Sequence, residues 1–399
     1  MSERIVITGA GIVSAIGTNQ LQCQENLKNG FSGIGEVRYL PTVHHEFPVG
    51  EVKLSNAQMC DLLGIDRSQV YSRTALMGIM AVKEALTQAG IDSSHGSMTL
   101  ISGTTVGGMD VSEQLFSRGM SPDDCVGCIT THTCGASTCA IASHFGKAFN
   151  ATITTSTACS SALNAIAMGC DLINAGKAQV VVAGGSECLT LFHLNGFKSL
   201  MILDTERCKP FDNNRRGLNL GEGAAFVVIE SEQHAASRGA TILTEIAGYG
   251  NACDAFHQTA SSPEGEGAFL AMTKALAAAE MVPGDIDYIN AHGTGTTNND
   301  QSESMAIRRV FGENVPPVSS TKSFTGHTTS AAGAIETVIS LMALNGQFLP
   351  ENLGWSTPMD EGGIIPVTET RSASLSNVMC NSFGFGGNDS SLILSKYVK

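Results

Sequence analysis

The stretch ATITTSTACSSALNAIAMG, residues 151–169, joins a predicted strand to a predicted helix and places a cysteine at the junction. Residues 151–155 are largely β-branched, which favours a strand. Residues 160–176 lack proline and carry apolar residues on nearly all helical faces, which predicts a deeply buried helix. Unpaired N–H groups at a helix N-terminus favour negative charge, so we expect Cys159 to have a lowered pKa and to act as a nucleophile. The alternative is a small buried residue with a packing role, the commoner situation for a cysteine.

The composition restricts the classes of function. The chain has 399 residues, of which 42% are apolar and 15% charged, and its net charge of −14 argues against a nucleic-acid or anionic-membrane surface. Residues 1–17 lack a basic segment and their apolar run is interrupted, so we expect no signal peptide, and no apolar run approaches the length of a membrane span. The twelve cysteines are therefore expected to be free thiols in a reducing cytoplasm.

Strands and helices alternate along the chain, and their order repeats. The predicted strands of the first part are 4–8, 98–103, 151–155, 179–184 and 224–230, and its predicted helices are about 70–90, 110–118 and 160–176. After residue 241 we predict strands at 244–250, 286–291, 317–320, 378–383 and 390–395, and helices at 265–281, 300–311 and 330–345. Most strands are continuous apolar runs, which is typical of sheets buried on both faces. We predict a duplicated α/β unit with halves 1–240 and 241–399.

Three further loops carry residues suited to catalysis. Residues 290–296 (NAHGTGT) and 322–327 (KSFTGH) each place a histidine after a predicted strand, and residues 381–387 (NSFGFGG) join the last two strands. Taken singly, each is also explained as a loop histidine that bonds backbone or as a tight hairpin. Together, a thiolate could accept an acyl group while two imidazole N–H groups hold a second thioester carbonyl as an enolate forms. A thiolate and two imidazole donors are the groups that a decarboxylating Claisen condensation requires.

These motifs, with TACSS at 157–161, resemble those of β-ketoacyl-acyl-carrier-protein synthases, the elongating Cys-His-His type also called KAS I/II. The resemblance runs from the first predicted strand to the last. It implies an α/β thiolase fold, in which two similar halves form a layered α-β-α-β-α core, usually in a dimer. It also implies an acyltransferase that condenses an acyl group on Cys159 with a malonyl group on the carrier protein, extending a fatty-acid or polyene chain by two carbons.

The resemblance implies a role for each matching residue. Cys159 would accept the acyl group, while His292 and His327 would polarise the malonyl thioester and assist loss of carbon dioxide. Lys322 and Glu336 would support the histidines, although an ordinary salt bridge is the alternative for this pair.

Other implied roles concern substrate and ion binding. The backbone N–H groups of Cys159 and Phe385 would form an oxyanion hole, and Phe385 would gate the acyl pocket. Thr294 and Thr296 would line the phosphopantetheine channel, although they could also be simple turn hydroxyls. The remaining implied substrate-binding residues are Phe383, Gly384, Gly386 and Gly387. No cofactor or catalytic metal is implied, but the polar groups near Asn290, Glu336 and Asn381 resemble a monovalent-cation site found in some members.

Related families differ at single positions. Chain-initiating synthases carry asparagine in place of one histidine, whereas His327 is present here. Thiolases have a second catalytic cysteine near the C-terminus, and the neighbours of Cys380 do not match that pattern. Chain-length factors lack the nucleophile, and Cys159 is present. Two alternative functions remain open: a partner subunit that shapes the pocket of another synthase, and a cysteine thioester hydrolase.

Two stretches depart from a general fatty-acid synthase. Residues 189–204 and 217–223 are more similar to condensing enzymes of aryl-polyene pigment clusters, which would imply an unsaturated or aryl-primed chain; sequence drift is the alternative. Residues 124–139 hold several zinc-type ligands, but we favour tight packing at a subunit contact. Those ligands are Cys125, Cys128, His132, Cys134 and Cys139.

The remaining expectations concern partners and isolated motifs. The acyl and malonyl groups would arrive on an acidic carrier protein, and the dimer could contain like or unlike chains. Candidates for a basic docking patch are Arg67, Arg73, Lys209, Arg215 and Arg216. Residues 9–14 (GAGIVS) do not complete a dinucleotide motif, and we predict a turn after the first strand there. His193 and His257 are expected to be structural or solvated.

Overall fold

The computed structural model describes residues 3–92, 96–119, 121, 130–360 and 363–398. The first half contains β1 (Ile5–Val13), α1 (Gln20–Lys28), α2 (Asn56–Leu63), α3 (Arg73–Ala89), β2 (Met98–Gly103), α4 (Met109–Ser117), α6 (Cys134–His144), β3 (Phe149–Thr155), α7 (Ser161–Asn174), β4 (Val180–Glu187), α8 (Leu191–Ser199), β5 (Gly223–Ser231) and α9 (Glu232–Ser237). The second contains β6 (Thr244–Cys253), α10 (Glu266–Ala278), β7 (Tyr288–Asn290), α11 (Thr297–Phe311), β8 (Val318–Ser319), α12 (Lys322–Thr325), α13 (Ala332–Gly346), β9 (Phe348–Leu349), β10 (Arg371–Ser372), β11 (Asn377–Gly384) and β12 (Asn388–Ser395).

The sheet topology repeats from one half to the other. The large sheet has the order β3-β2-β4-β5-β1-β6-β12-β11-β7-β8, so its two ends are built in the same way. In the first half β2 runs parallel to β3 and β4, and β5 is antiparallel to β4 and β1. In the second half β7 runs parallel to β8 and β11, and β12 is antiparallel to β11 and β6. The half-sheets join where β1 pairs with β6, and the repeated pattern confirms a duplicated α/β fold.

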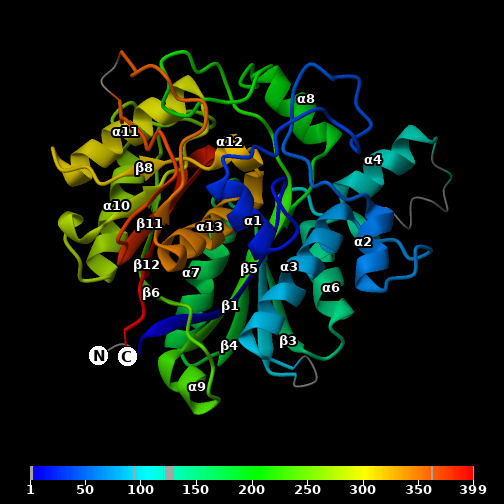
Figure 1. The fold of residues 1–399 in the computed structure, drawn as a ribbon. Coiled ribbons are helices and arrows are strands. Elements are labelled where there is room, and N and C mark those ends of the chain that lie inside the picture. The colour runs from blue at the N-terminus through cyan, green and yellow to red at the C-terminus, as the bar shows by residue number, and fades with distance from the viewer. Residues whose placement is uncertain (1–2, 93–95, 120, 122–129, 361–362, 399) are drawn as a thin grey trace.

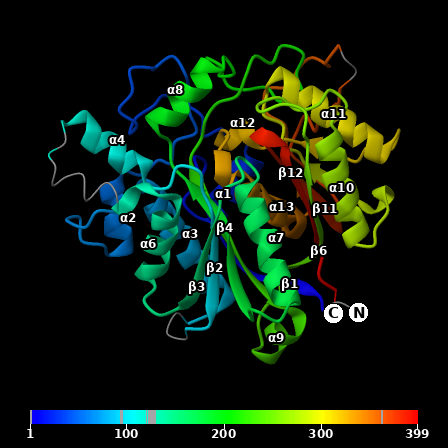
Figure 2. The same ribbon diagram turned by 180° about the vertical axis from the view of Figure 1, so that it is seen from behind.

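The helices form layers around these half-sheets. Figures 1 and 2 show α7 and α13 in the middle of the molecule, α3 and α6 on one side, and α10 and α11 on the other. The first thirteen residues of α13, from Ala332 to Leu344, are all buried, so this helix occupies the centre of the core. The α7 helix is less buried than its sequence predicts, because Met168 and Asp171 are exposed on one face.

The glycines near the N-terminus explain how α3 packs on the sheet. Gly9 and Gly11 lie inside β1, which corrects the turn predicted for residues 9–14. A Cβ atom on Gly9 would lie 2.2 Å from the Ala85 carbonyl oxygen, and one on Gly11 would lie 2.0 Å from that of Ala81. Both glycines therefore permit the backbone of α3 to approach the strand closely.

Two further features bear on surroundings and partners. β3 lies at one edge of the sheet and exposes Asn150 and Thr152. Among the helices of the described residues, none combines the length and the apolar character needed to cross a bilayer.

Candidate active site

Cys159 lies in a tight turn between β3 and α7, one position earlier than the helix cap at Ser160. The preceding residue, Ala158, has a left-handed backbone conformation with φ of 51°, which is unfavourable for a residue with a Cβ atom. Ser161 holds this turn, because its Oγ accepts a hydrogen bond from the Thr157 N–H (2.8 Å) and donates one to the Ala158 carbonyl (2.6 Å). The turn points the thiol into the site instead of along the strand.

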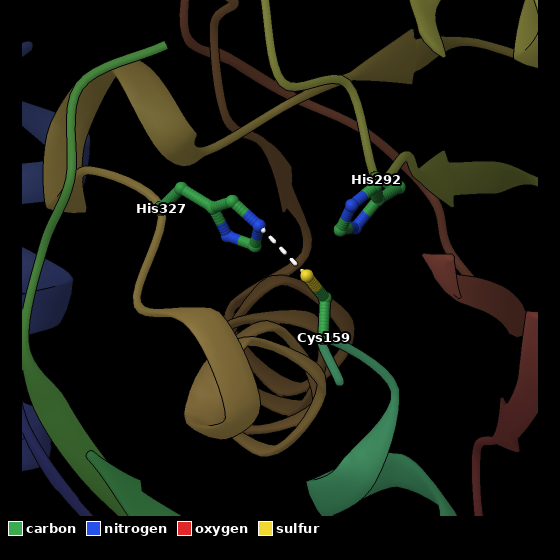
Figure 3. A group of neighbouring side chains, drawn as sticks. All are labelled: Cys159, His292 and His327. Carbon is green, nitrogen blue, oxygen red and sulfur yellow. Dashed lines mark hydrogen bonds between the residues drawn. The ribbon is translucent and has the colours of Figure 1, made fainter. Parts of the chain in front are cut away.

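The three predicted catalytic side chains meet in the structure. His327 Nε2 lies 3.1 Å from Cys159 Sγ, and Figure 3 shows the two imidazole rings pointing toward the sulfur from either side. The ring centroids of His292 and His327 are 5.2 Å apart and the rings are nearly perpendicular, at 84°. One ligand-type atom from each of the three residues lies within 4.8 Å of the others, and all three residues are buried. The cysteine thus forms one cluster with two histidines that follow it by 133 and 168 positions in the chain.

Lys322 fixes the hydrogen-bonding state of His292. Its Nζ donates to His292 Nδ1 (3.2 Å), to the His292 carbonyl (2.5 Å) and to Glu336 Oε1. Because an ammonium group has no lone pair, Nδ1 of His292 must be the acceptor. The proton of the neutral ring therefore resides on Nε2, where it can be donated to a substrate.

Burial controls the ionisation of the site. It raises the pKa of the Cys159 thiol to about 11, against the opposing effects of Lys322 and of a backbone hydrogen bond from Phe385. Burial also lowers the pKa values of His292 and His327 well below the usual range, with a further lowering by Lys322. The lowered thiol pKa predicted from the helix terminus is therefore wrong for this state, because loss of hydration outweighs the favourable contacts. At neutral pH a protonated thiol faces two neutral imidazoles.

The 381–387 loop closes over the sulfur. The backbone N–H of Phe385 donates to the Cys159 thiol, and a Cβ atom on Gly384 would lie only 3.2 Å from the Cys159 backbone nitrogen. The Phe385 ring stacks on Phe197, with 5.8 Å between centroids and 20° between planes. The structure thus places one of the two predicted oxyanion donors at the sulfur.

A cavity of about 300 Å³ connects this cluster with the surface. Its wall includes all three predicted catalytic side chains, and the hydroxyls of Thr294 and Thr296 lie 2.8 Å apart on it. The other predicted substrate-binding residues on the wall are Phe383, Gly384, Phe385, Gly386 and Gly387. All the substrate-binding residues predicted from the sequence therefore border one space.

Sequence reasoning missed two carboxylates of α11. Glu303 accepts hydrogen bonds from the N–H groups of His292 (2.9 Å) and Gly293 (2.7 Å), and Asp300 accepts one from Gly295 (3.1 Å). Both are buried, and burial raises the pKa of Glu303 to about 7. They hold the loop that carries His292. In the sequence they are ordinary polar residues of a helix, with no motif to mark them.

The structure corrects part of the basic docking patch predicted from the sequence. Arg73 is buried in an ion pair with Glu222, and Arg215 is buried near Asp300, so neither can belong to a surface docking patch. Arg67, Lys209 and Arg216 do reach the surface.

Cys125 and Cys128 of the suggested zinc cluster lie outside the described residues. Of the others, His132 bonds Ser112, Cys134 is half-buried and Cys139 is exposed.

Comparisons with known proteins agree with this geometry. Residues 2–235 match the family described as "Beta-ketoacyl synthase, N-terminal domain", and residues 243–356 match "Beta-ketoacyl synthase, C-terminal domain". The chain belongs to the β-ketoacyl synthase family. This membership confirms the predicted family, the thiolase fold and the class of acyl-transferring condensing enzyme.

Relatives of this β-ketoacyl synthase cover nearly its whole length. It is 36% identical to nodulation protein E of Rhizobium meliloti (strain 1021), over 98% of this chain and 99% of that protein. It is 36% identical to 3-oxoacyl-[acyl-carrier-protein] synthase 1 of Haemophilus influenzae, over 99% of each. A solved ishigamide ketosynthase/chain length factor superimposes with a TM-score of 0.91 at 28% identity, covering 100% of both chains. The ketosynthase ApeO in complex with its chain length factor ApeC from Xenorhabdus doucetiae gives 0.85 at 32%, covering 99% of this chain and 98% of that one.

The raised pKa of Cys159 predicts how the thiol reacts with an alkylating agent. Only the thiolate is alkylated, and its fraction rises about tenfold per pH unit below the pKa. Alkylation of Cys159 by iodoacetamide should therefore keep accelerating from about pH 7 to 9.5, as followed by peptide mass mapping. The exposed Cys139 and Cys253 serve as internal controls. A Cys159 rate that levels off below about pH 8 would contradict a buried, protonated thiol.

Proposed function

We propose that this β-ketoacyl synthase uses acyl-carrier-protein thioesters, extending a fatty-acid or polyene chain by two carbons. The observation that carries the proposal is the contact of 3.1 Å between Cys159 Sγ and His327 Nε2, with His292 held beside it in the Nε2–H form. One histidine can thus accept the thiol proton while the other is a hydrogen-bond donor. The names of the similar synthases support the carrier protein as substrate.

In the first step the acyl group moves to the enzyme. His327 Nε2 takes the proton of the Cys159 thiol as the sulfur attacks the acyl carbonyl of the carrier thioester. The carbonyl oxygen becomes an oxyanion that the backbone N–H of Phe385 can receive. The carbon–sulfur bond to the carrier then breaks, and the departing carrier sulfur takes the proton from His327. The result is an acyl thioester on Cys159 and a free carrier thiol.

In the second step a malonyl thioester occupies the same cavity. Its carboxylate leaves as carbon dioxide, and the electron pair of that bond forms an enolate whose oxygen accepts a hydrogen bond from the Nε2–H of His292. The enolate carbon attacks the acyl carbonyl on Cys159, and the bond from that carbonyl to Cys159 Sγ breaks. The product is a β-ketoacyl chain on the carrier, and the departing Cys159 thiolate takes a proton from water that enters the cavity, which returns the thiol.

The two alternative functions are less well supported. A purely pocket-shaping subunit needs no nucleophile or histidine pair, whereas Cys159, His292 and His327 form a compact buried cluster here. A thioester hydrolase needs a positioned water and releases a free acid. Within the described residues, His327 Nδ1 has no hydrogen-bond partner, so no carboxylate orients this ring as the base for such a water.

We propose that β3 is the contact edge of a dimer. Its outer side carries exposed residues, and an unpaired strand edge is a template for pairing with another chain. The similar structures that contain a ketosynthase and a chain length factor make an unlike partner a second possibility.

The dimer proposal predicts a mass near twice 41.6 kDa by native mass spectrometry. Ala151→Asp places a charge on the exposed edge of β3 and should release monomers, whereas Thr273→Asp on the distant α10 should not. A dimer that withstands the first substitution would place the contact elsewhere.

We also propose a monovalent-cation site beside the buried side-chain oxygens of Asn290 and Glu336. Asn290 Oδ1 and Glu336 Oε2 are buried and have no hydrogen-bond partner within the described residues, which fits an ion that takes oxygen ligands. Asn381 is buried close by, but its Oδ1 already accepts a hydrogen bond from Ser391. Such an ion would supply structural charge balance only.

The melting temperature of the protein should then be higher in potassium or sodium than in tetramethylammonium at equal ionic strength, and equal values would contradict the cation site.

Intact mass spectrometry tests the proposed nucleophile. The protein is incubated with saturated, polyene and aryl-primed acyl-carrier thioesters. We expect one acyl adduct on the wild type and none on Cys159→Ala, because the only proposed acceptor is then missing. His292→Ala should still load, but its malonyl decarboxylation should fall roughly 10²- to 10⁴-fold, since it loses an enolate donor.

The same experiment separates the alternatives. An adduct that turns over to free acid without malonyl carrier would indicate a hydrolase. No adduct from any donor would contradict the proposed function, and loading restored by a second chain would indicate a partner subunit.

A further inference from the structure

A third buried histidine lies close to the active site without touching it. His193 is on α8 and is 6% exposed. Its ring meets Phe197, one helical turn further along, edge to face, with 6.0 Å between centroids and 90° between planes. The condensation steps above make no use of this imidazole.

The imidazole of His193 is held in a single state. A ring N–H donates to the backbone carbonyl of Cys188, and burial lowers the pKa of the imidazole to about 4. The ring is therefore neutral at physiological pH and exerts no charge on His327. A phenylalanine could fill the same space but could not form the bond to Cys188.

The helix that carries His193 is itself tied to its neighbours. Thr190 caps α8 by accepting the His193 N–H (3.1 Å). Glu113 of α4 accepts the N–H groups of Leu191 (2.9 Å) and Phe192 (2.8 Å). The backbone of the first turn of α8 is thus fixed, so the His193 ring has a rigid base.

A series of contacts connects His193 with the nucleophile. His193 packs against Phe197, Phe197 stacks on Phe385, and the Phe385 N–H reaches Cys159 Sγ. The cavity beside these rings measures about 300 Å³, at the small end for ligand pockets, and must admit both a carrier arm and an acyl chain. The Phe197 and Phe385 rings in its wall must therefore move to admit a long chain.

We infer that His193 is a positioning residue that holds Phe197, and through it Phe385, in the closed arrangement over Cys159. His193 thereby sets how readily long acyl chains load relative to short ones. The inference rests on the proposed function, because it concerns loading of Cys159. It assigns no proton transfer to His193, which acts only through the ring contacts.

The test compares two half-reactions in wild type and in His193→Ala. Loading of Cys159 is timed by intact mass with hexanoyl and hexadecanoyl carrier thioesters, and malonyl decarboxylation is timed by release of carbon dioxide. Removing the ring leaves space beneath Phe197, so the ratio of long-chain to short-chain loading rates should rise roughly three- to tenfold. Decarboxylation should stay within about twofold, because the change alters no contact of His292 or His327. The matched control is His257→Ala, which removes an exposed histidine.

A double-mutant cycle shows whether the effect passes through Phe197. In a Phe197→Ala background, His193→Ala should change the loading ratio no further, because the ring that His193 supports is already absent. His193→Phe, which retains an edge-on ring, should return the ratio most of the way to the wild-type value. Should His193→Ala fail to fold, His193→Gln replaces it throughout.

Three results would overturn the inference: an unchanged ratio, an equal fall in loading and decarboxylation, or independent effects in the double-mutant cycle. Failure of the proposed function itself looks different, because the wild type would then load no acyl group at all.

Discussion

The hydrogen bond from Lys322 Nζ to His292 Nδ1 is the interaction on which the rest of the site depends. The ammonium group is fully buried, so it must be matched by acceptors, and the structure supplies Glu336 and the His292 carbonyl. With Nδ1 occupied, His292 can only present an N–H toward the cavity. Burial lowers the pKa values of both histidines, and the nearby positive charge of Lys322 lowers them further, so both rings stay neutral. A donor geometry useful for an enolate thus follows from one buried cation.

The duplicated fold brings the reacting groups together. The nucleophile enters from the first half, in the turn before α7, whereas both histidines, Lys322 and Glu336 come from the second half. The halves are joined near the site by Ser160, whose Oγ donates to Asn388 Oδ1 (2.7 Å), and by Ser382, whose Oγ donates to the Cys159 carbonyl (3.0 Å). Neither half alone contains the groups for acyl transfer and condensation.

Much of this arrangement was predictable because it depends on local patterns. Continuous apolar runs located the strands, and motif loops after strands located Cys159, His292 and His327. Properties that depend on packing were not predictable. The pKa of Cys159 follows from burial by distant segments, and Arg73 is hidden because Glu222, far along the chain, pairs with it. Glu303 supports the His292 loop from a helix whose sequence carries no catalytic motif. The sequence around Gly9 and Gly11 predicts a turn, because the close packing of α3 against these strand residues is not visible in a local pattern.

The central claim is that one buried cysteine and two neutral histidines carry out both acyl transfer and carbon–carbon bond formation. A single-turnover experiment addresses it most directly. Enzyme already acylated on Cys159 is mixed with malonyl carrier, and the enzyme mass, the product mass and the released carbon dioxide are followed together. The account predicts loss of the adduct, one carbon dioxide per adduct, and a carrier-bound β-ketoacyl chain two carbons longer. Loss of the adduct as free acid, or release of carbon dioxide without chain extension, would contradict it.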